Sequence, residues 1–150
     1  MKTLYLMQGI PGSGKSTIAR LIRDMGGKAV SAIFSTDELW YDDEAGRYNY
    51  DPALLGVKHR ENQRRVIQAM IDDTLRIIII DNTNITRKEA KPYVVMAEIF
   101  GFEIQVVRVS VSVDVAKRRQ SERPFDRRVP DAVIESMATR MQDLTGESGE

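Results

Sequence analysis

Residues 9–17 read Gly-Ile-Pro-Gly-Ser-Gly-Lys-Ser-Thr and match the phosphate-binding pattern G-x-x-x-x-G-K-[ST]. Backbone N–H groups can surround phosphate oxygens only where the chain curls tightly, and Gly12 and Gly14 permit that curl. The pattern assigns Lys15 to the β- and γ-phosphates and the Ser16 hydroxyl to Mg²⁺. The expected nucleotide-binding residues of this loop are Gly12, Ser13, Gly14, Lys15, Ser16 and Thr17. The stretch therefore predicts a site for ATP or GTP together with Mg²⁺.

A first acidic residue, Asp37, follows a strand-like run that ends at Phe34. In an open parallel sheet, ligands bind beyond the carboxyl ends of the strands, which puts Asp37 on the same rim as the phosphate loop. A carboxylate placed there can orient an acceptor hydroxyl and take its proton. The alternative is a helix cap before Glu38, and both roles are compatible if Ser35 or Thr36 supplies the cap.

A second acidic residue, Asp81, follows four consecutive isoleucines at 77–80. An apolar strand that ends in an acidic residue is typical of a Walker B segment, in which the carboxylate holds Mg²⁺ directly or through water. The next residues, Asn82-Thr83-Asn84, continue along the expected rim. They could contact substrate or nucleotide, or form Asx turns before the following helix.

Basic side chains gather in residues 117–128, namely Lys117, Arg118, Arg119, Arg123, Arg127 and Arg128. Arg119 and Arg123 are four residues apart and share a helix face. Such a segment is expected to favour an anionic ligand, and residues 117–129 are predicted to act as a lid whose arginines close over phosphates. The alternative is a solvated helix end.

Strand-like and helical runs alternate along the chain. The predicted strands are 3–8, 28–34, 76–81 and 102–110, and the predicted helices are 15–25, 52–74, 86–100, 113–122 and 130–144. This alternation predicts a doubly wound parallel sheet, an α/β three-layer sandwich of the P-loop NTPase type, formed by one domain over residues 1–150. Residues 41–51 form a polar, aromatic loop, and 145–150 a flexible tail.

Composition bounds the class of protein. The 150 residues contain 22 Lys plus Arg, 22 Asp plus Glu and no cysteine. The net charge thus neither supports nor excludes a nucleic-acid partner, and disulfides and thiolate metal sites are excluded. No apolar stretch approaches the ~20 residues of a membrane span, and no N-terminal signal pattern is present. We expect a soluble, cytoplasmic protein; nothing in the sequence indicates its oligomeric state.

Read in order, these motifs resemble the P-loop kinase domain of the polynucleotide 5′-hydroxyl kinases, a compact zeta-toxin- and AAA-like domain. The chain is especially similar to the ATP-binding domain, with reported polynucleotide kinase activity, of a family of ubiquitin-ligase-binding proteins. The resemblance covers residues 3–141. Its further carriers are Phe34-Ser-Thr-Asp-Glu38, Tyr48-Asn-Tyr-Asp-Pro52, Lys58-His-Arg-Glu-Asn62, Ile80-Asp-Asn-Thr-Asn84, Lys91-Pro-Tyr93 and Val129-Pro130.

The resemblance implies roles for individual residues. Lys15 and Ser16 would hold phosphate and metal, and Asp37 would act as general base on a 5′-hydroxyl. Asp81 and Asn84 would line the site. The family's lid arginines, which engage the nucleotide phosphates and the transition state, correspond here to Arg119 and Arg123. His59 and Asn62 match a helix motif to which no task is assigned, and Arg87 joins the expected substrate residues.

One departure from the family concerns the acceptor. The phage members place an arginine shortly after the base, whereas here Glu38-Leu39-Trp40 follows Asp37. Trp40 is therefore assigned to the acceptor site, where it could stack on a base together with Tyr41, Tyr48 and Tyr50. The alternative is that these aromatic rings pack the loop onto the core.

The sequence therefore predicts a Mg²⁺-dependent kinase that transfers a γ-phosphoryl group to a hydroxyl, with the 5′ end of DNA or RNA as the expected acceptor. Two alternatives stay open: a kinase for a small hydroxyl compound such as a nucleoside, sugar or antibiotic, and a nucleotide-binding module without catalysis. A repair role would need partner proteins, because phosphatase and ligase domains are not seen beside the kinase motifs.

Overall fold

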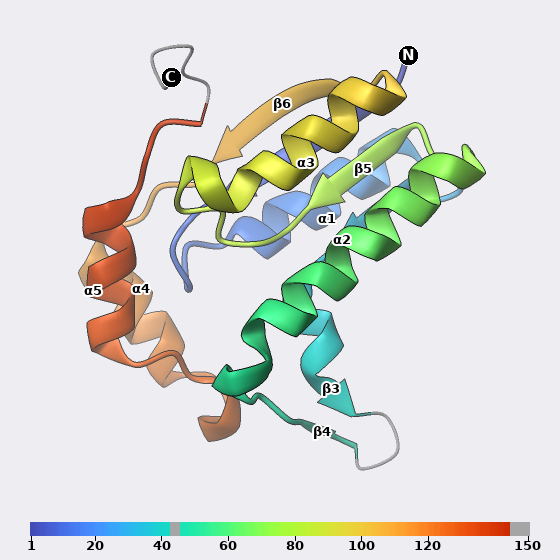
Figure 1. Ribbon diagram of the computed structural model, residues 1–150. Coiled ribbons are helices and arrows are strands. Elements are labelled where there is room, and N and C mark those ends of the chain that lie inside the picture. Colours follow the sequence, from blue (N-terminus) through green and yellow to red (C-terminus); the bar gives the residue numbers. More distant parts are fainter. Residues whose placement is uncertain (43–45, 145–150) are drawn as a thin grey trace.

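The computed structural model describes residues 1–42 and 46–144 (Figure 1). Its centre is a parallel sheet of four strands in the order β2-β5-β1-β6. The strands are β1 (Thr3–Gln8), β2 (Ser31–Phe34), β5 (Ile77–Ile80) and β6 (Glu103–Arg108). The expected parallel α/β sheet is thus confirmed. The predicted tail at 145–150 lies outside the described residues.

The sheet is covered on both faces, which explains its apolar strands. Figure 1 shows α2 (Leu55–Asp72) and α3 (Arg87–Phe100) in front of the sheet and α1 (Lys15–Gly26) behind it. Leu4 and Leu6 of β1 pack with the α2 and α3 side, whereas Met7 packs with α1. Because successive strand residues point to opposite faces, both layers are held by burial of alternate side chains.

Two further helices, α4 (Val113–Ser121) and α5 (Asp131–Arg140), lie on the side toward which the strand arrows point (Figure 1). Ala116 and Ile134 are fully buried between them and the loops that follow β1 and β5. The short 3₁₀ turn η3 (Phe125–Arg127) connects the two helices. The basic segment is therefore positioned at the carboxyl ends of the strands.

The structure shortens several predicted elements. The predicted helix 130–144 ends at Arg140, since Gln142 is tied to the strand ends: its N–H donates to the Ile85 carbonyl, and its own carbonyl accepts from the Gln8 amide. The predicted helix 52–74 divides into the 3₁₀ turn η2 (Pro52–Leu54) and α2. The predicted strand 28–34 begins only at Ser31, after a turn in which the Val30 N–H donates to the Gly27 carbonyl.

The segment expected as a loop at 41–51 carries a short hairpin. The 3₁₀ turn η1 (Thr36–Trp40) leads into β3 (Tyr41–Asp42), which pairs antiparallel with β4 (Arg47–Tyr48). Tyr41 and Tyr48 lie directly opposite each other in this pairing. None of the helices in the described part of the chain combines the length and hydropathy that crossing a bilayer requires.

Candidate functional site

The phosphate-binding loop connects β1 to α1 and is packed against α4. Gly12 and Gly14 have φ of 88° and 93°, the left-handed region that favours glycine. A Cβ at Gly12 would lie 2.7 Å from the backbone oxygen of Ala116 in α4. From the same helix, Arg119 donates a hydrogen bond from Nη1 to the Gly12 carbonyl at 3.0 Å. Two contacts therefore join the loop to the first helix of the basic segment.

The expected metal ligands meet at the start of α1. The Ser16 hydroxyl donates to Oδ2 of Asp81 at 2.7 Å, and Lys15 Nζ lies 3.9 Å from Oδ1 of the same carboxylate. Asp81 is 8% exposed, and its Oδ1 accepts no hydrogen bond. A hydroxyl beside a carboxylate that keeps one oxygen unused suits Mg²⁺, which prefers oxygen ligands and takes the remaining ones from water and substrate phosphates. The residues therefore fit the ion.

Lys15 is a partly buried cation at the centre of this site, with its side chain 14% exposed. Burial lowers the pKa of Lys15, while the negative charges of Asp81 and Asp37 act in the opposite direction and the positive charge of Arg123 lowers the pKa further. Four groups from separate elements thus share one electrostatic environment. A phosphate bound beside Lys15 would add negative charge there and so favour the protonated form of the lysine.

Asp37 is free of the capping role that was its alternative. Ser35 caps η1: its hydroxyl accepts from the Asp37 N–H at 3.1 Å, and the Glu38 carboxylate accepts from the Ser35 N–H at 3.2 Å. The Asp37 carboxylate is exposed and accepts from the Tyr48 hydroxyl at 2.6 Å. The pKa of Tyr48 is raised, mainly by burial of its hydroxyl and secondly by this hydrogen bond to Asp37.

Basic and aromatic side chains lie beside this carboxylate. The guanidinium of Arg127, in η3, lies 5.3 Å from the ring centre of Tyr48 and 5.5 Å from that of Tyr41. Arg123 is near enough for its charge to lower the pKa of both Lys15 and Tyr48. Positive charge therefore borders both the phosphate-binding loop and Asp37. The contacts of Arg127 with Tyr41 and Tyr48 were not indicated by the sequence, because they depend on how η3 meets the hairpin.

Three expected substrate residues have other surroundings. Trp40 is 4% exposed and packs edge-on against Tyr50, as the packing alternative holds; stacking on a substrate base would require the ring to leave its site. Asn84 is 1% exposed, and its Nδ2 donates to the Met7 carbonyl at 2.7 Å, so its side chain stabilises the end of β1. Arg87 donates from Nε to the Asp143 carbonyl at 3.0 Å and holds the C-terminal segment.

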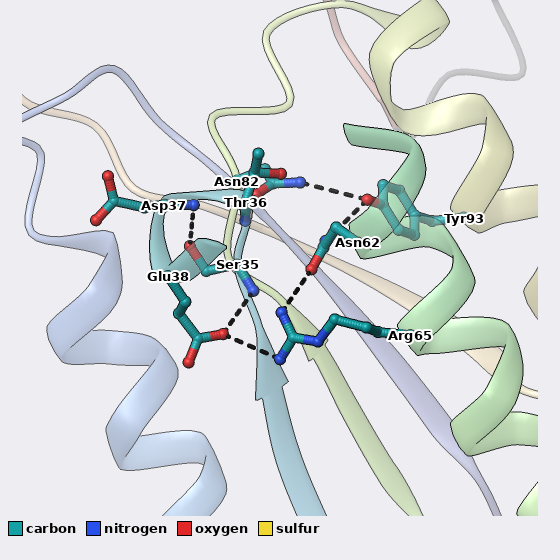
Figure 2. A network of polar contacts seen from close by, with 8 residues as sticks. All are labelled: Ser35, Thr36, Asp37, Glu38, Asn62, Arg65, Asn82 and Tyr93. Carbon is teal, nitrogen blue, oxygen red and sulfur yellow. Dashed lines mark hydrogen bonds and ion pairs between the residues drawn. The ribbon is translucent and has the colours of Figure 1, made fainter. Parts of the chain in front are cut away.

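Figure 2 shows polar contacts behind Asp37 that the sequence did not indicate. Asn82 Oδ1 accepts a hydrogen bond from the Thr36 N–H at 2.9 Å and so connects the segment after β5 to the segment after β2. Asn62 is fully buried and donates to the Tyr93 hydroxyl at 2.9 Å. His59 places Nδ1 3.3 Å from the Thr36 hydroxyl. Only the contacts of His59 and Asn62 fall on a motif that the sequence showed, the His-x-x-Asn motif, to which no task had been assigned.

Two curated proteins match about two thirds or more of the chain in sequence. A stretch of 101 residues is 39% identical to human NEDD4-binding protein 2 and covers 67% of this chain and 5% of that protein. A stretch of 118 residues is 30% identical to the 2′,3′-cyclic-nucleotide 3′-phosphodiesterase of Pongo abelii, covering 71% of this chain and 24% of the relative. The chain thus corresponds to a small part of each relative.

Two solved structures share the fold. A chain of the Pnkp1/Rnl/Hen1 RNA repair complex superposes with a TM-score of 0.70 at 18% identity, covering 98% of this chain and 50% of that chain. Kti12 of Chaetomium thermophilum in complex with ADP-AlF3 superposes with a TM-score of 0.65 at 19% identity, covering 93% of this chain and 80% of that chain. The family model described as AAA domain matches residues 4–144. With its phosphate-binding loop and parallel sheet in place, the chain belongs to this AAA domain family, AAA_33, of P-loop proteins.

Proposed function

We propose that the protein is a Mg²⁺-dependent kinase that transfers the γ-phosphoryl group of ATP to the 5′-hydroxyl of a DNA or RNA end. The observation that carries this proposal is the state of Asp37: an exposed carboxylate, relieved of capping by Ser35, that acts electrostatically on Lys15 of the phosphate-binding loop. A carboxylate beside bound phosphates has the position that an acceptor-orienting base requires.

Each side chain has a task in this reaction. Lys15 would bind the β- and γ-phosphates, and Ser16 and Asp81 would hold Mg²⁺, which supplies charge neutralisation on the phosphate oxygens when bound. Asp37 would orient the acceptor hydroxyl and accept its proton as the new P–O bond forms. Arg119 and Arg123 would neutralise charge on the transferring group, with residues 117–129 acting as a lid.

A nucleic-acid acceptor is favoured by the groups around Asp37. Arg127 and Arg123 provide positive charge on that side, and Tyr41 and Tyr48 provide aromatic rings. Basic and aromatic side chains together are typical of surfaces that bind single-stranded nucleic acid. Similarity to a chain of an RNA repair complex supports the same acceptor class. We place the protein in the cytoplasm, acting with partner proteins that carry out other repair steps.

A second candidate is nucleotide binding or hydrolysis without an acceptor, and the fold shared with the ADP-AlF3 complex of Kti12 favours it. A kinase for a small alcohol is a third, since a protein described as a sugar kinase superposes with a TM-score of 0.61. Both candidates use the same loop and differ from the proposal in what faces Asp37.

A transfer assay separates the three candidates. Labelled ATP is incubated with a 5′-hydroxyl oligonucleotide, the same oligonucleotide bearing a 5′-phosphate, and a set of nucleosides and sugars. The proposal expects label only on the 5′-hydroxyl strand, with kcat/KM falling roughly tenfold between about 50 and about 200 mM salt as two or three phosphate contacts are screened. Transfer to a neutral alcohol without salt dependence, or release of phosphate alone, would refute it.

A further inference from the structure

The turn that carries Asp37 is held by a ring of polar contacts that the Ser35–Thr36 peptide bond completes, and we call it the polar ring (Figure 2). Its members are Ser35, Thr36, Glu38, Asn62, Arg65, Asn82 and Tyr93. They come from η1 and its cap, from α2, from the loop after β5 and from α3. Four elements far apart in sequence therefore meet behind a single exposed carboxylate.

One half of the polar ring holds the residue before Asp37. The Thr36 N–H donates to Asn82 Oδ1 at 2.9 Å, and Asn82 Nδ2 lies 3.5 Å from the Tyr93 hydroxyl. The same hydroxyl accepts from Asn62 Nδ2 at 2.9 Å. Asn62 is 0% and Tyr93 1% exposed, so neither can replace a lost partner with water. The Tyr93 hydroxyl thus joins the two amides, and the fully buried Asn62 Nδ2 depends on it for its hydrogen bond.

The other half holds the residue after Asp37. Arg65 donates from Nη1 to Asn62 Oδ1 and from Nη2 to Glu38 Oε1, both at 3.4 Å. Glu38 Oε1 also accepts from the Ser35 N–H. The peptide bond between Ser35 and Thr36 joins this half to the first, and the Ser35 hydroxyl accepts from the Asp37 N–H. The backbone of Asp37 is therefore fixed on both flanks, while its carboxylate is left outside the ring.

We infer that the polar ring positions the Asp37 carboxylate for the acceptor, with Asn62 and Tyr93 as positioning residues and the His-x-x-Asn motif of α2 as its sequence signature. The inference deepens the proposed function and rests on it. Tyr93 belongs to the apolar cluster on the α2 and α3 side, and Asn62 is buried in α2 together with Val66 and Met70. Directional hydrogen bonds aimed at one turn explain why polar groups are used there.

The first test is Tyr93→Phe, which removes the hydroxyl that joins Asn62 and Asn82 and keeps the volume of the aromatic side chain. Two quantities are measured below the unfolding temperature: kcat with KM for ATP, and hydrogen exchange of the Thr36 amide. We expect kcat to fall roughly ten- to a hundredfold because the carboxylate is misplaced, with KM for ATP within about twofold. Exchange at Thr36 should rise about tenfold. The matched control is Tyr5→Phe, on the α1 side of the sheet, which should change neither quantity.

The second test is Arg65→Met, which removes the guanidinium from a partly exposed position and guards against misfolding of the first variant. Arg64→Met, at the neighbouring exposed position outside the polar ring, is its control. A lower kcat together with faster exchange of the Thr36 amide in both Tyr93→Phe and Arg65→Met supports the inference, and any other combination overturns it. If the wild-type protein phosphorylates no acceptor, the proposed function fails, and Thr36 exchange alone then decides whether the ring holds the turn.

Discussion

The packing of the phosphate-binding loop on α4 makes Gly12 and Gly14 respond differently to the same substitution. Both have φ near +90°, so an alanine at either position is forced into a strained backbone conformation. Their surroundings differ. A Cβ at Gly12 would meet the Ala116 backbone oxygen at 2.7 Å, whereas a Cβ at Gly14 would meet only the flexible end of Arg119 at 3.5 Å. The pair therefore separates backbone strain from steric overlap.

The expected magnitudes follow from these contacts. Left-handed strain costs about 1–2 kcal/mol at each position. At Gly12 the overlap with helix backbone adds about 1–3 kcal/mol, because α4 has to shift as a unit. We therefore expect Gly12→Ala to lower the free energy of unfolding by about 2–5 kcal/mol and Gly14→Ala by about 1–2 kcal/mol.

Urea unfolding of the two variants and the wild type, without nucleotide, measures this difference. Because α4 also carries Arg119, which donates to the Gly12 carbonyl, ADP affinity should fall more in Gly12→Ala than in Gly14→Ala. Equal losses of unfolding free energy in the two variants would show that α4 does not rest on the loop as described, and would refute the reasoning.

Three further predictions concern charge. Lys15→Ala should reduce phosphoryl transfer by at least about a hundredfold, measured as kcat, because the phosphates lose their partly buried cation. Asp81→Asn should abolish most of the gain in ADP affinity that Mg²⁺ provides, measured by calorimetry with and without the ion, while metal-free affinity does not fall. Burial lowers the pKa of His59, the single histidine, so the unfolded state binds a proton more readily than the folded state does. The free energy of unfolding should therefore decline as pH drops from 6.5 through the folded pKa of His59. Urea titrations of His59→Gln should not show this decline.

Much of the fold could be predicted because its signals are local. The phosphate-binding loop, the isoleucine strand and the alternation of periodic segments each occupy one short stretch. Since parallel strands end at one edge, topology places Asp81 on the same rim as the phosphate-binding loop, where the Ser16 hydroxyl donates to its carboxylate at 2.7 Å. The capping of η1 by Ser35 was likewise among the predicted possibilities.

What could not be predicted depends on how elements pack. Asn62 and Tyr93 are 31 residues apart, and their contact exists only because α2 lies beside α3 on the same face of the sheet. Trp40 is buried where Tyr50, beyond β4, packs edge-on against its ring and Lys58 of α2 lies over it, contacts that no periodic pattern in the sequence indicates. The position of Trp40 shortly after Asp37, together with its aromatic side chain, suggested a substrate contact, whereas in the fold the ring is buried.

The central claim is that Asp37 serves the acceptor rather than the nucleotide. The measurement that tests it most directly is single-turnover transfer by Asp37→Asn to a 5′-hydroxyl oligonucleotide, with ADP affinity measured on the same sample. We predict a rate lower by about a hundred- to ten-thousandfold with unchanged ADP affinity. A wild-type rate in this variant would contradict the assignment of Asp37 as base.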